Sequence, residues 1–344
     1  MSKTRYFYES EKKRQTELIL DGFFGELERG NGKFRGKCYP FVLQQRGGYT
    51  NLYEPIRLEA LSYFRDNNIV WWAGSSPTGH LLSSQIACVN HLMPLRKDPK
   101  AVLALINGIR NQFKAVLPLP CDADESYIAF EAVSKSDYLN EGRPTRGSNC
   151  TSVDALVYAV DKNNERWIIP IEWKYTESYD DCNSGDKSNE GITYMVENIQ
   201  TKKTKGAARL DRYTDLIKKS HQLRSVPEFA LGTTYPLQGS IYFFEPFYQL
   251  MRQTLWAEQM LDNKVTEDVK ADHYLHIHVV PSAANDLLEK KYRPAKGKNM
   301  EETWRSCIVD QSKYMIIDPQ DFMQPIKKTH PELWSYLYKR YYDI

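Results

Sequence analysis

Two short apolar runs, separated by a five-residue turn, constrain the fold of this chain more than any other part of its 344 residues. The runs are SVDALVYAV at 152–160 and RWIIPIEWKY at 166–175, and both are rich in the β-branched and aromatic residues that favour strands. The segment between them, DKNNE at 161–165, consists mainly of turn-forming residues. The pattern therefore predicts a β-hairpin whose turn is centred near residue 163.

Three charged residues lie near one end of this predicted hairpin. Because side chains alternate between the two faces of a strand, Glu172 and Lys174 project from the same face. Asp154 on the first strand then lies opposite Glu172 or Lys174, and the sequence leaves this choice of register open. The intermediate register, in which Asp154 faces Trp173, would place a carboxylate among apolar rings. We therefore expect two carboxylates and one ammonium group to converge at one end of the hairpin.

This arrangement suits metal-assisted hydrolysis of a phosphodiester. Carboxylate oxygens such as those of Asp154 and Glu172 hold Mg²⁺ and leave positions open for phosphate and water, and Mn²⁺ is an expected substitute. The ion would polarise the phosphate and lower the pKa of the attacking water. Lys174 would orient that water or offset the charge that develops in the transition state. The expected catalytic residues are therefore Asp154, Glu172 and Lys174.

The same residues also have ordinary structural interpretations. Glu172 and Lys174 would then form a surface ion pair, which contributes little to stability, and Asp154 would cap the entry to a strand. We favour the metal site because a surface pair rarely ends a run as apolar as WIIPIEW.

The first 120 residues have a helical pattern. Apolar residues recur at three- and four-residue spacing over 56–64, 81–95 and 101–113, and a further helix is expected near 17–27. A proline-containing break, LPLPCDAD, then ends this region. We expect residues 1–120 to form a mainly helical N-terminal region that packs on a core made by residues 121–344.

The core combines strands with helices. Besides the hairpin, short apolar runs predict strands at 127–133, 273–281 and 313–318, and helical patterns lie at 208–220, 244–261 and 330–342. The fold class is therefore α/β.

An acid that begins one strand and a Glu-x-Lys that ends the next resemble the PD-(D/E)XK nuclease superfamily. The runs SVDA and IEWKYTE, with FEAVSKSDYLNEG upstream, are more narrowly similar to a bacterial restriction-endonuclease-like family of uncharacterised proteins. The segments LLSSQIACVNHLMPL and YQLMRQ also resemble that family, so the resemblance covers about residues 50 to 260. Val153 stands where the superfamily name has proline, a departure that is common in such nucleases.

The resemblance implies a restriction-endonuclease-like core, which is a mixed central sheet flanked by helices, here with a helical N-terminal extension. It also implies Mg²⁺ as cofactor, DNA as the usual substrate and a role in defence or DNA processing. A third acid can complete the metal site in related nucleases, and Glu141 and Glu131 both remain candidates for it here.

Several polar side chains outside the hairpin are candidates for binding the substrate. Those on helices are equally explained as polar helix residues, and for the two loop arginines an exposed position without such a role is the commoner outcome. An arginine could reach a phosphate or pair with a carboxylate. These candidates are Ser84, Gln85, Arg143, Arg146, Gln249 and Arg252. The basic runs KKTKGAAR and KKYRPAKGK could contact phosphates, but such runs are more often solvated surface.

Composition and the absence of known motifs limit the cellular compartment and the kinds of binding site that this chain can have. A net charge of +2 means that any contact with nucleic acid depends on local patches. The chain has neither a secretory leader nor an apolar run long enough to span a membrane, and its six cysteines are scattered, so we expect a cytoplasmic protein. The absence of GxxxxGK[ST], GxGxxG and GxSxG excludes the corresponding ATP, dinucleotide and serine-hydrolase sites.

The sequence thus predicts a Mg²⁺-dependent endonuclease that acts on DNA, with RNA as an open alternative. A homodimer would supply the two sites that double-strand cutting needs, and a defence-system protein is a further expected partner. The alternative is a catalytically silent protein with a nuclease-like fold that only binds nucleic acid. A third hypothesis, an interaction protein with paired strand-end charges, predicts neither metal binding nor DNA affinity.

Overall fold

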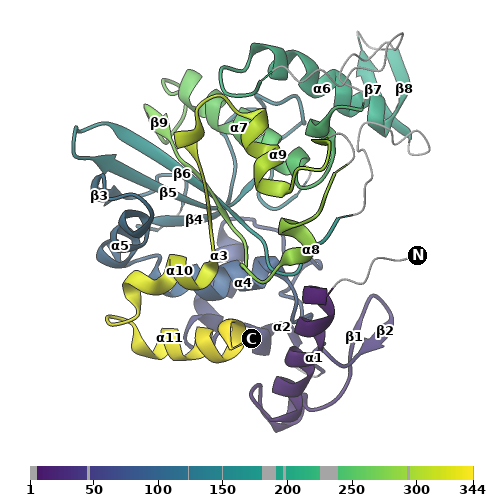
Figure 1. Ribbon diagram of the computed structural model, residues 1–344, viewed down its shortest axis with the longest axis vertical. Coiled ribbons are helices and arrows are strands. Elements are labelled where there is room, and N and C mark those ends of the chain that lie inside the picture. Colours follow the sequence, from purple (N-terminus) through teal and green to yellow (C-terminus); the bar gives the residue numbers. More distant parts are fainter. Residues whose placement is uncertain are drawn as a thin grey trace.

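A mixed β-sheet lies at the centre of the protein, with helices on both of its faces (Figure 1). The computed structural model describes residues 6–44, 47–122, 124–148, 150–179, 191–196, 199–224, 239–292 and 295–343. In this part of the chain the sheet contains seven strands: β3 (Phe113–Leu117), β4 (Ile128–Ala132), β5 (Val153–Asp161), β6 (Arg166–Trp173), β9 (His273–Tyr274), β10 (His276–Val279) and β11 (Tyr314–Ile317).

The predicted hairpin, β5 and β6, forms the middle of this sheet. The two strands are antiparallel, whereas β10 runs parallel to both β6 and β11. Strands β3 and β4 pair with opposite halves of β5, and β9 pairs with β6 beside β10. The mixed sheet with flanking helices confirms the predicted fold class, and the strands expected at 127–133, 273–281 and 313–318 all belong to it.

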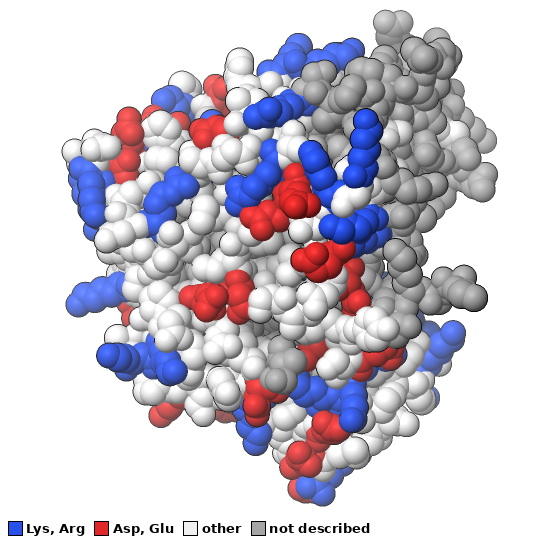
Figure 2. Space-filling view, viewed as in Figure 1, with Lys and Arg blue, Asp and Glu red and all other residues white. Residues whose placement is uncertain are grey.

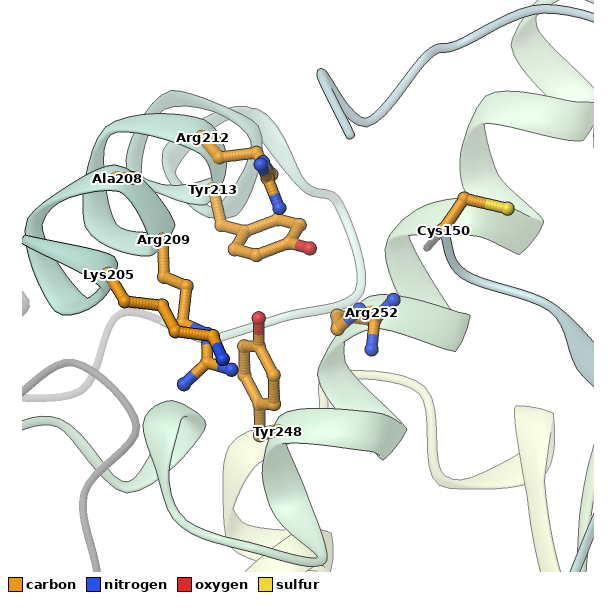
Figure 3. A pocket seen from close by; sticks show the side chains of 8 residues that line it. All are labelled: Cys150, Lys205, Ala208, Arg209, Arg212, Tyr213, Tyr248 and Arg252. Carbon is orange, nitrogen blue, oxygen red and sulfur yellow. The ribbon is translucent and has the colours of Figure 1, made fainter. Parts of the chain in front are cut away.

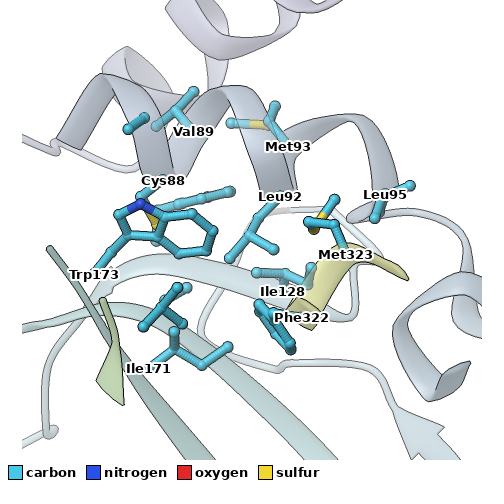
Figure 4. Close-up of a cluster of buried hydrophobic side chains, with 14 of the residues drawn as sticks. Cys88, Val89, Leu92, Met93, Leu95, Ile128, Ile171, Trp173, Phe322 and Met323 are labelled. Atoms are coloured by element: carbon cyan, nitrogen blue, oxygen red, sulfur yellow. The ribbon is translucent and has the colours of Figure 1, made fainter. Parts of the chain in front are cut away.

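One face of the sheet is covered by helices from both ends of the chain. Ile171 and Trp173 of β6 pack against a helix from the N-terminal region and against Phe322 and Met323 from the C-terminal region (Figure 4). The helices on this face are α3 (Arg57–Asp66), α4 (Ser84–Leu92), α5 (Pro99–Ile109), α10 (Pro319–Met323) and α11 (Pro331–Leu337).

The other face is covered by α6 (Lys205–Lys219), α7 (Phe247–Asp262) and α9 (Met300–Cys307). Leu156 of β5 and Ile168 of β6 pack into this second core with residues of α7. The even-numbered positions at the end of β6 face this side, so Glu172 and Lys174 project toward α7 while Trp173 projects the other way. The alternation predicted for the hairpin is confirmed.

The N-terminal region differs in detail from the prediction. The first helix, α1 (Tyr6–Leu20), begins earlier than expected and ends before Gly22, whose φ of 76° is a backbone conformation that glycine adopts readily. Residues 1–120 also contain a small hairpin, β1 (Gly32–Phe34) and β2 (Lys37–Tyr39), and strand β3 of the central sheet. This region is therefore not purely helical.

The remaining elements are short or lie apart from the sheet. A separate hairpin consists of β7 (Gly191–Val196) and β8 (Ile199–Thr204). The short helices are α2 (Gly47–Asn51) and α8 (Asn285–Leu288), and single helical turns are η1 (Glu26–Glu28), η2 (Glu54–Ile56), η3 (Met93–Leu95), η5 (Ile241–Phe243), η7 (Gln311–Lys313), η8 (Gln324–Ile326) and η9 (Tyr338–Tyr342). In the described ranges, no helix is both long and apolar enough to cross a membrane.

Candidate active site

Three carboxylates lie in a row on neighbouring strands of the central sheet. Ala155 pairs with Ile171, so the next position along the hairpin places Asp154 opposite Glu172. On the other side of β5, Glu131 lies between two paired positions of β4, which places it opposite Asp154. The register that the sequence left open is therefore the one that brings Asp154 and Glu172 together.

Asp154 occupies the middle of this row. One of its oxygens, Oδ2, accepts a hydrogen bond from the backbone N–H of Trp173 at 2.7 Å. Burial, and then the negative charges of Glu172 and Glu131, raise the pKa of Asp154 well above its ordinary value. The repulsion means that a cation bound among these carboxylates would be favourable.

Lys174 provides a positive charge at the end of this row. Its ammonium donates to Oε1 of Glu172 and to Oε1 of Gln249, and the side chains of Lys174 and Glu172 are each only 6% exposed. Burial by itself would lower the pKa of Lys174, but the nearby negative charges, Glu172 foremost, outweigh it and the net shift is upward. Lys174 is therefore charged at neutral pH. Its pair with Glu172 is buried, so it is not the surface ion pair that the alternative interpretation of the sequence predicts.

Helix α7 positions the polar end of this group. Gln249 and Gln253 are one helical turn apart and both face the sheet, where Gln253 donates from Nε2 to Oε2 of Glu172. The sequence indicated Gln249 as a candidate but not Gln253. The four-residue spacing from Gln249 was the available signal, although it indicates a shared helix face and not a contact with Glu172.

The two candidates for a third acid have different surroundings. Glu141 is held by Arg252 at 2.9 Å, by both the backbone N–H and the hydroxyl of Thr151, and by the hydroxyl of Tyr213. Burial opposes ionisation of Glu141, but these partners, Arg252 foremost, lower its pKa overall. Glu141 therefore belongs to a satisfied ion pair outside the row of acids.

Glu131, by contrast, lies within the row. Its two carboxylate oxygens accept hydrogen bonds of 2.8 Å from Gln85 and from Ser152. Burial raises the pKa of Glu131, and the charge of Glu172 adds to this shift. Its φ of 49° is unusual for a residue with a side chain, and such strained conformations are concentrated at functional sites.

The predicted substrate-binding residues on α4 divide into two kinds. Gln85 connects Glu131 to the backbone N–H of Trp72 and to the carbonyl of Val70, so it supports the row of acids from the N-terminal region. Ser84 is the first residue of α4, directly after Ser83, whose hydroxyl caps the helix.

The two predicted arginines upstream of β5 also differ. Arg143 lies on an exposed loop. Arg146 points into the protein, where its guanidinium donates to the carbonyl of Phe130 and the hydroxyl of Tyr63 and pairs with buried Asp122 at 3.1 Å. The structure therefore places Arg146 in an internal network and not at a surface that could grip a DNA backbone.

A cavity of about 180 Å³ opens onto the row of acids. It is lined by Cys150, Thr151, Ser152, Asp154, Glu172, Gln249, Arg252 and Gln253. Four of the expected site residues line this cavity: Asp154, Glu172, Gln249 and Arg252. Lys174 and Glu131 do not line it but lie beside it, Lys174 through its contacts with Glu172 and Gln249 and Glu131 through its place in the row of acids. Ser84, Gln85, Arg143, Arg146 and Glu141 do not line it.

The side chains at this cavity fit a hard cation with an incomplete protein shell. Within the described ranges, no three His, Cys, Asp or Glu side chains lie close enough together to form a full metal site. Asp154 and Glu172 do line the same cavity, and Mg²⁺ is commonly bound through one or two carboxylates with water and substrate phosphate as its other ligands. The donor oxygens and their mutual repulsion are compatible with such an ion.

Comparison with known protein families gives a match over most of the chain. The model of a family described as "Restriction Endonuclease associating with ARP" matches residues 23–342. No curated protein and no solved structure matches the chain. The family match spans all seven strands of the sheet and the cavity described above.

Proposed function

The chain belongs to the family of restriction endonucleases associating with ARP, and from this membership we propose that it hydrolyses DNA phosphodiester bonds in a Mg²⁺-dependent reaction. The observation that carries the proposal is the buried Lys174–Glu172 pair beside Asp154, where the two carboxylates, but not the ammonium, line a polar cavity. Burying these charges costs free energy, which a bound cation would offset. Such a cost is commonly retained where the charges serve a function.

Each residue of the site has a role in this proposal. Asp154 and Glu172 would hold the cation. Glu131, on the neighbouring strand, is the third acid of the row and would support the site without completing a three-carboxylate metal shell. When bound, Mg²⁺ would neutralise charge on the phosphate and lower the pKa of the attacking water. Lys174 orients that water and stabilises the negative charge of the transition state through its ammonium group.

Helix α7 keeps these groups in position. Gln249 and Gln253 each hold one charged partner, Lys174 and Glu172, so that both side chains keep one orientation when substrate enters. Loss of such supporting contacts commonly costs a site 10–100-fold in metal affinity or activity, by the order of magnitude known for other metal enzymes.

The partners follow from the same membership. The family description names an association with ARP, and we propose that this chain acts with such a protein in defence or DNA processing. Cutting both strands of a duplex would need a second copy of the site, which a homodimer would supply.

The proposal is tested by incubating the purified chain with supercoiled and linear DNA, modified and unmodified, and with RNA. We expect cleavage of DNA with Mg²⁺ or Mn²⁺ and none with EDTA. Glu172→Gln should abolish cutting, while Glu26→Gln, a matched change at a side chain that is 74% exposed, should not affect it.

Two results would contradict the proposal. Metal-independent cutting, or cutting that survives in Glu172→Gln, would remove this site from the reaction. DNA retention without cleavage of any substrate would instead favour a protein that only binds nucleic acid.

A further inference from the structure

A second cavity, of about 320 Å³, lies next to the catalytic one. Four cationic side chains line it, and none of its lining residues is acidic. Figure 3 shows the basic groups of α6 and α7 ending around the rings of Tyr213 and Tyr248. Its lining residues are Cys150, Lys205, Ala208, Arg209, Arg212, Tyr213, Tyr248 and Arg252.

Helix α6 presents three of these cations from one face. Lys205, Arg209 and Arg212 are spaced by four and three residues, which places them on the same side of the helix. The first turns of this helix, whose partial positive charge also favours anions, therefore border the cavity. Lys205 and Arg209 come from the basic run KKTKGAAR, whose function the sequence left open.

Tyrosine rings build the floor of the cavity. The rings of Tyr213 and Tyr248 meet edge to face, with centroids 5.8 Å apart, and both residues are buried. Guanidinium groups lie over these rings: Arg209 and Arg252 over Tyr248 at 5.4 and 5.3 Å, and Arg212 over Tyr213 at 5.9 Å. These contacts restrict the orientations of the arginines, so less conformational entropy would be lost when they bind an anion.

The two cavities share part of their walls. Cys150 and Arg252 line both of them, and Arg252 is also fixed by its ion pair with Glu141. A nucleic acid strand whose scissile phosphate lies beside Asp154 would therefore have a neighbouring phosphate within reach of the second cavity.

We propose that this cavity, formed by Lys205, Arg209, Arg212 and Arg252, binds a backbone phosphate of the nucleic acid strand next to the bond that is cut. This inference rests on the proposed function. Arginine forks match the geometry of phosphate oxygens, and contacts of this kind fix the register of a strand without reading its sequence. The same chemistry would also attract the phosphates of a free nucleotide.

The test measures binding of a fluorescent DNA oligonucleotide, as single strand and as duplex, with Ca²⁺ in place of Mg²⁺. The double variant Arg209→Gln, Arg212→Gln is compared with Lys218→Gln, Lys219→Gln, which removes two charges from the exposed far end of the same helix. We expect the first variant to weaken binding about ten-fold and to reduce the salt dependence by roughly one phosphate contact. The control should stay within about two-fold of the wild type.

The outcomes separate this inference from the proposed function. Equal losses in both variants, or no loss in either, would overturn the inference even if the wild type cuts DNA. A loss confined to the cavity variant would support it even if the wild type does not cut. Displacement of the oligonucleotide by ATP or inorganic pyrophosphate at far lower concentration than by unlabelled DNA would assign the cavity to a free nucleotide and overturn it.

Discussion

At the scale of single residues, Asp154 is buried in an environment that is unfavourable for its charge in the absence of a cation. It is flanked by Glu172 and Glu131 on the neighbouring strands, and both raise its pKa beyond the effect of burial. An acid with a raised pKa binds its proton more tightly in the folded state than in the unfolded state. The stability of the fold therefore decreases as the pH rises from 3.8, the ordinary pKa of the aspartate side chain, to the higher pKa of Asp154 in the folded protein. At any pH above this range the full loss of stability remains.

Asp154→Asn should therefore stabilise the metal-free protein at pH 8 while abolishing cleavage. The amide can still accept the hydrogen bond from the backbone of Trp173, and the repulsion is gone. Each kcal/mol gained would raise the midpoint of thermal unfolding by roughly 1–2 °C for a chain of 344 residues. Differential scanning calorimetry in EDTA checks this, and a lower midpoint would indicate a structural carboxylate and not a metal ligand.

The sequence predicted some residues of this site and not others, for physical reasons. Alternation along β6 was enough to place Glu172 and Lys174 on one face, because local geometry determines it. The choice between Glu131 and Glu141 depends on the pairing of β4 with β5 and on the ion pair with Arg252. These are contacts between segments far apart in the chain, which no local pattern contains.

At the scale of elements, a network of hydrogen bonds and an ion pair around Arg146 connects β4 with α3. This side chain connects β4, through the carbonyl of Phe130, with Tyr63 and Asn67 at the end of α3 and with Asp122 in the preceding loop. The sequence indicated the central hairpin and the later strands but missed β1, β2 and β3. It treated Arg146 as a surface arginine, because a loop position upstream of a strand gives no sign of burial.

Arg146→Met should consequently destabilise the fold. It would remove the closer of the two arginines that pair with Asp122, whose side chain is 0% exposed, and leave Arg96 at 3.7 Å. Breaking a buried pair costs about 3 kcal/mol or more in comparable cases. Arg143→Met on the exposed loop is the control and should change the free energy of unfolding by less than about 0.5 kcal/mol. Urea titration measures both; an unchanged stability with weakened DNA binding in Arg146→Met would restore the role first expected for it.

At the scale of the whole molecule, helix α1 near the start of the chain contacts η9 near its end, beside the residue that follows Lys174. Arg14 of α1 and Arg340 near the C-terminus belong to a buried network that includes Tyr175, directly after Lys174. Charge is mixed over the visible face, with Lys and Arg most concentrated near α6 and α9 (Figure 2). On this face the basic side chains therefore gather near the cavity lined by α6 and α7 and are interspersed with acids elsewhere.

Buried neutral histidines make the free energy of unfolding depend on pH in the acid range. His91 packs against Trp173 and Tyr341, and burial lowers its pKa to about 3. Between the ordinary value of 6.5 and about 3, the unfolded chain binds a proton that the folded chain does not. Stability is therefore lost as pH falls through that window, by about 1.4 kcal/mol per pH unit for this residue.

His91→Asn should flatten this dependence. The variant is expected to be less stable than the wild type at pH 7 because a packed ring is lost, but the difference should shrink by about 2 kcal/mol between pH 6.5 and 5. Urea unfolding at several pH values gives the slopes. A difference that stays constant over this range would show that His91 is not a neutral group held against protonation.

The role proposed for Lys174, in a metal-dependent reaction at the end of β6, can be measured by single-turnover cleavage of DNA with saturating Mg²⁺. Lys174→Met should bind DNA as the wild type does but cut it at least about 100-fold more slowly, since it lacks the charge that stabilises the transition state. Lys13→Met, at a side chain that is 81% exposed, should cut normally. Cleavage by Lys174→Met at the wild-type rate would contradict the assignment of this site.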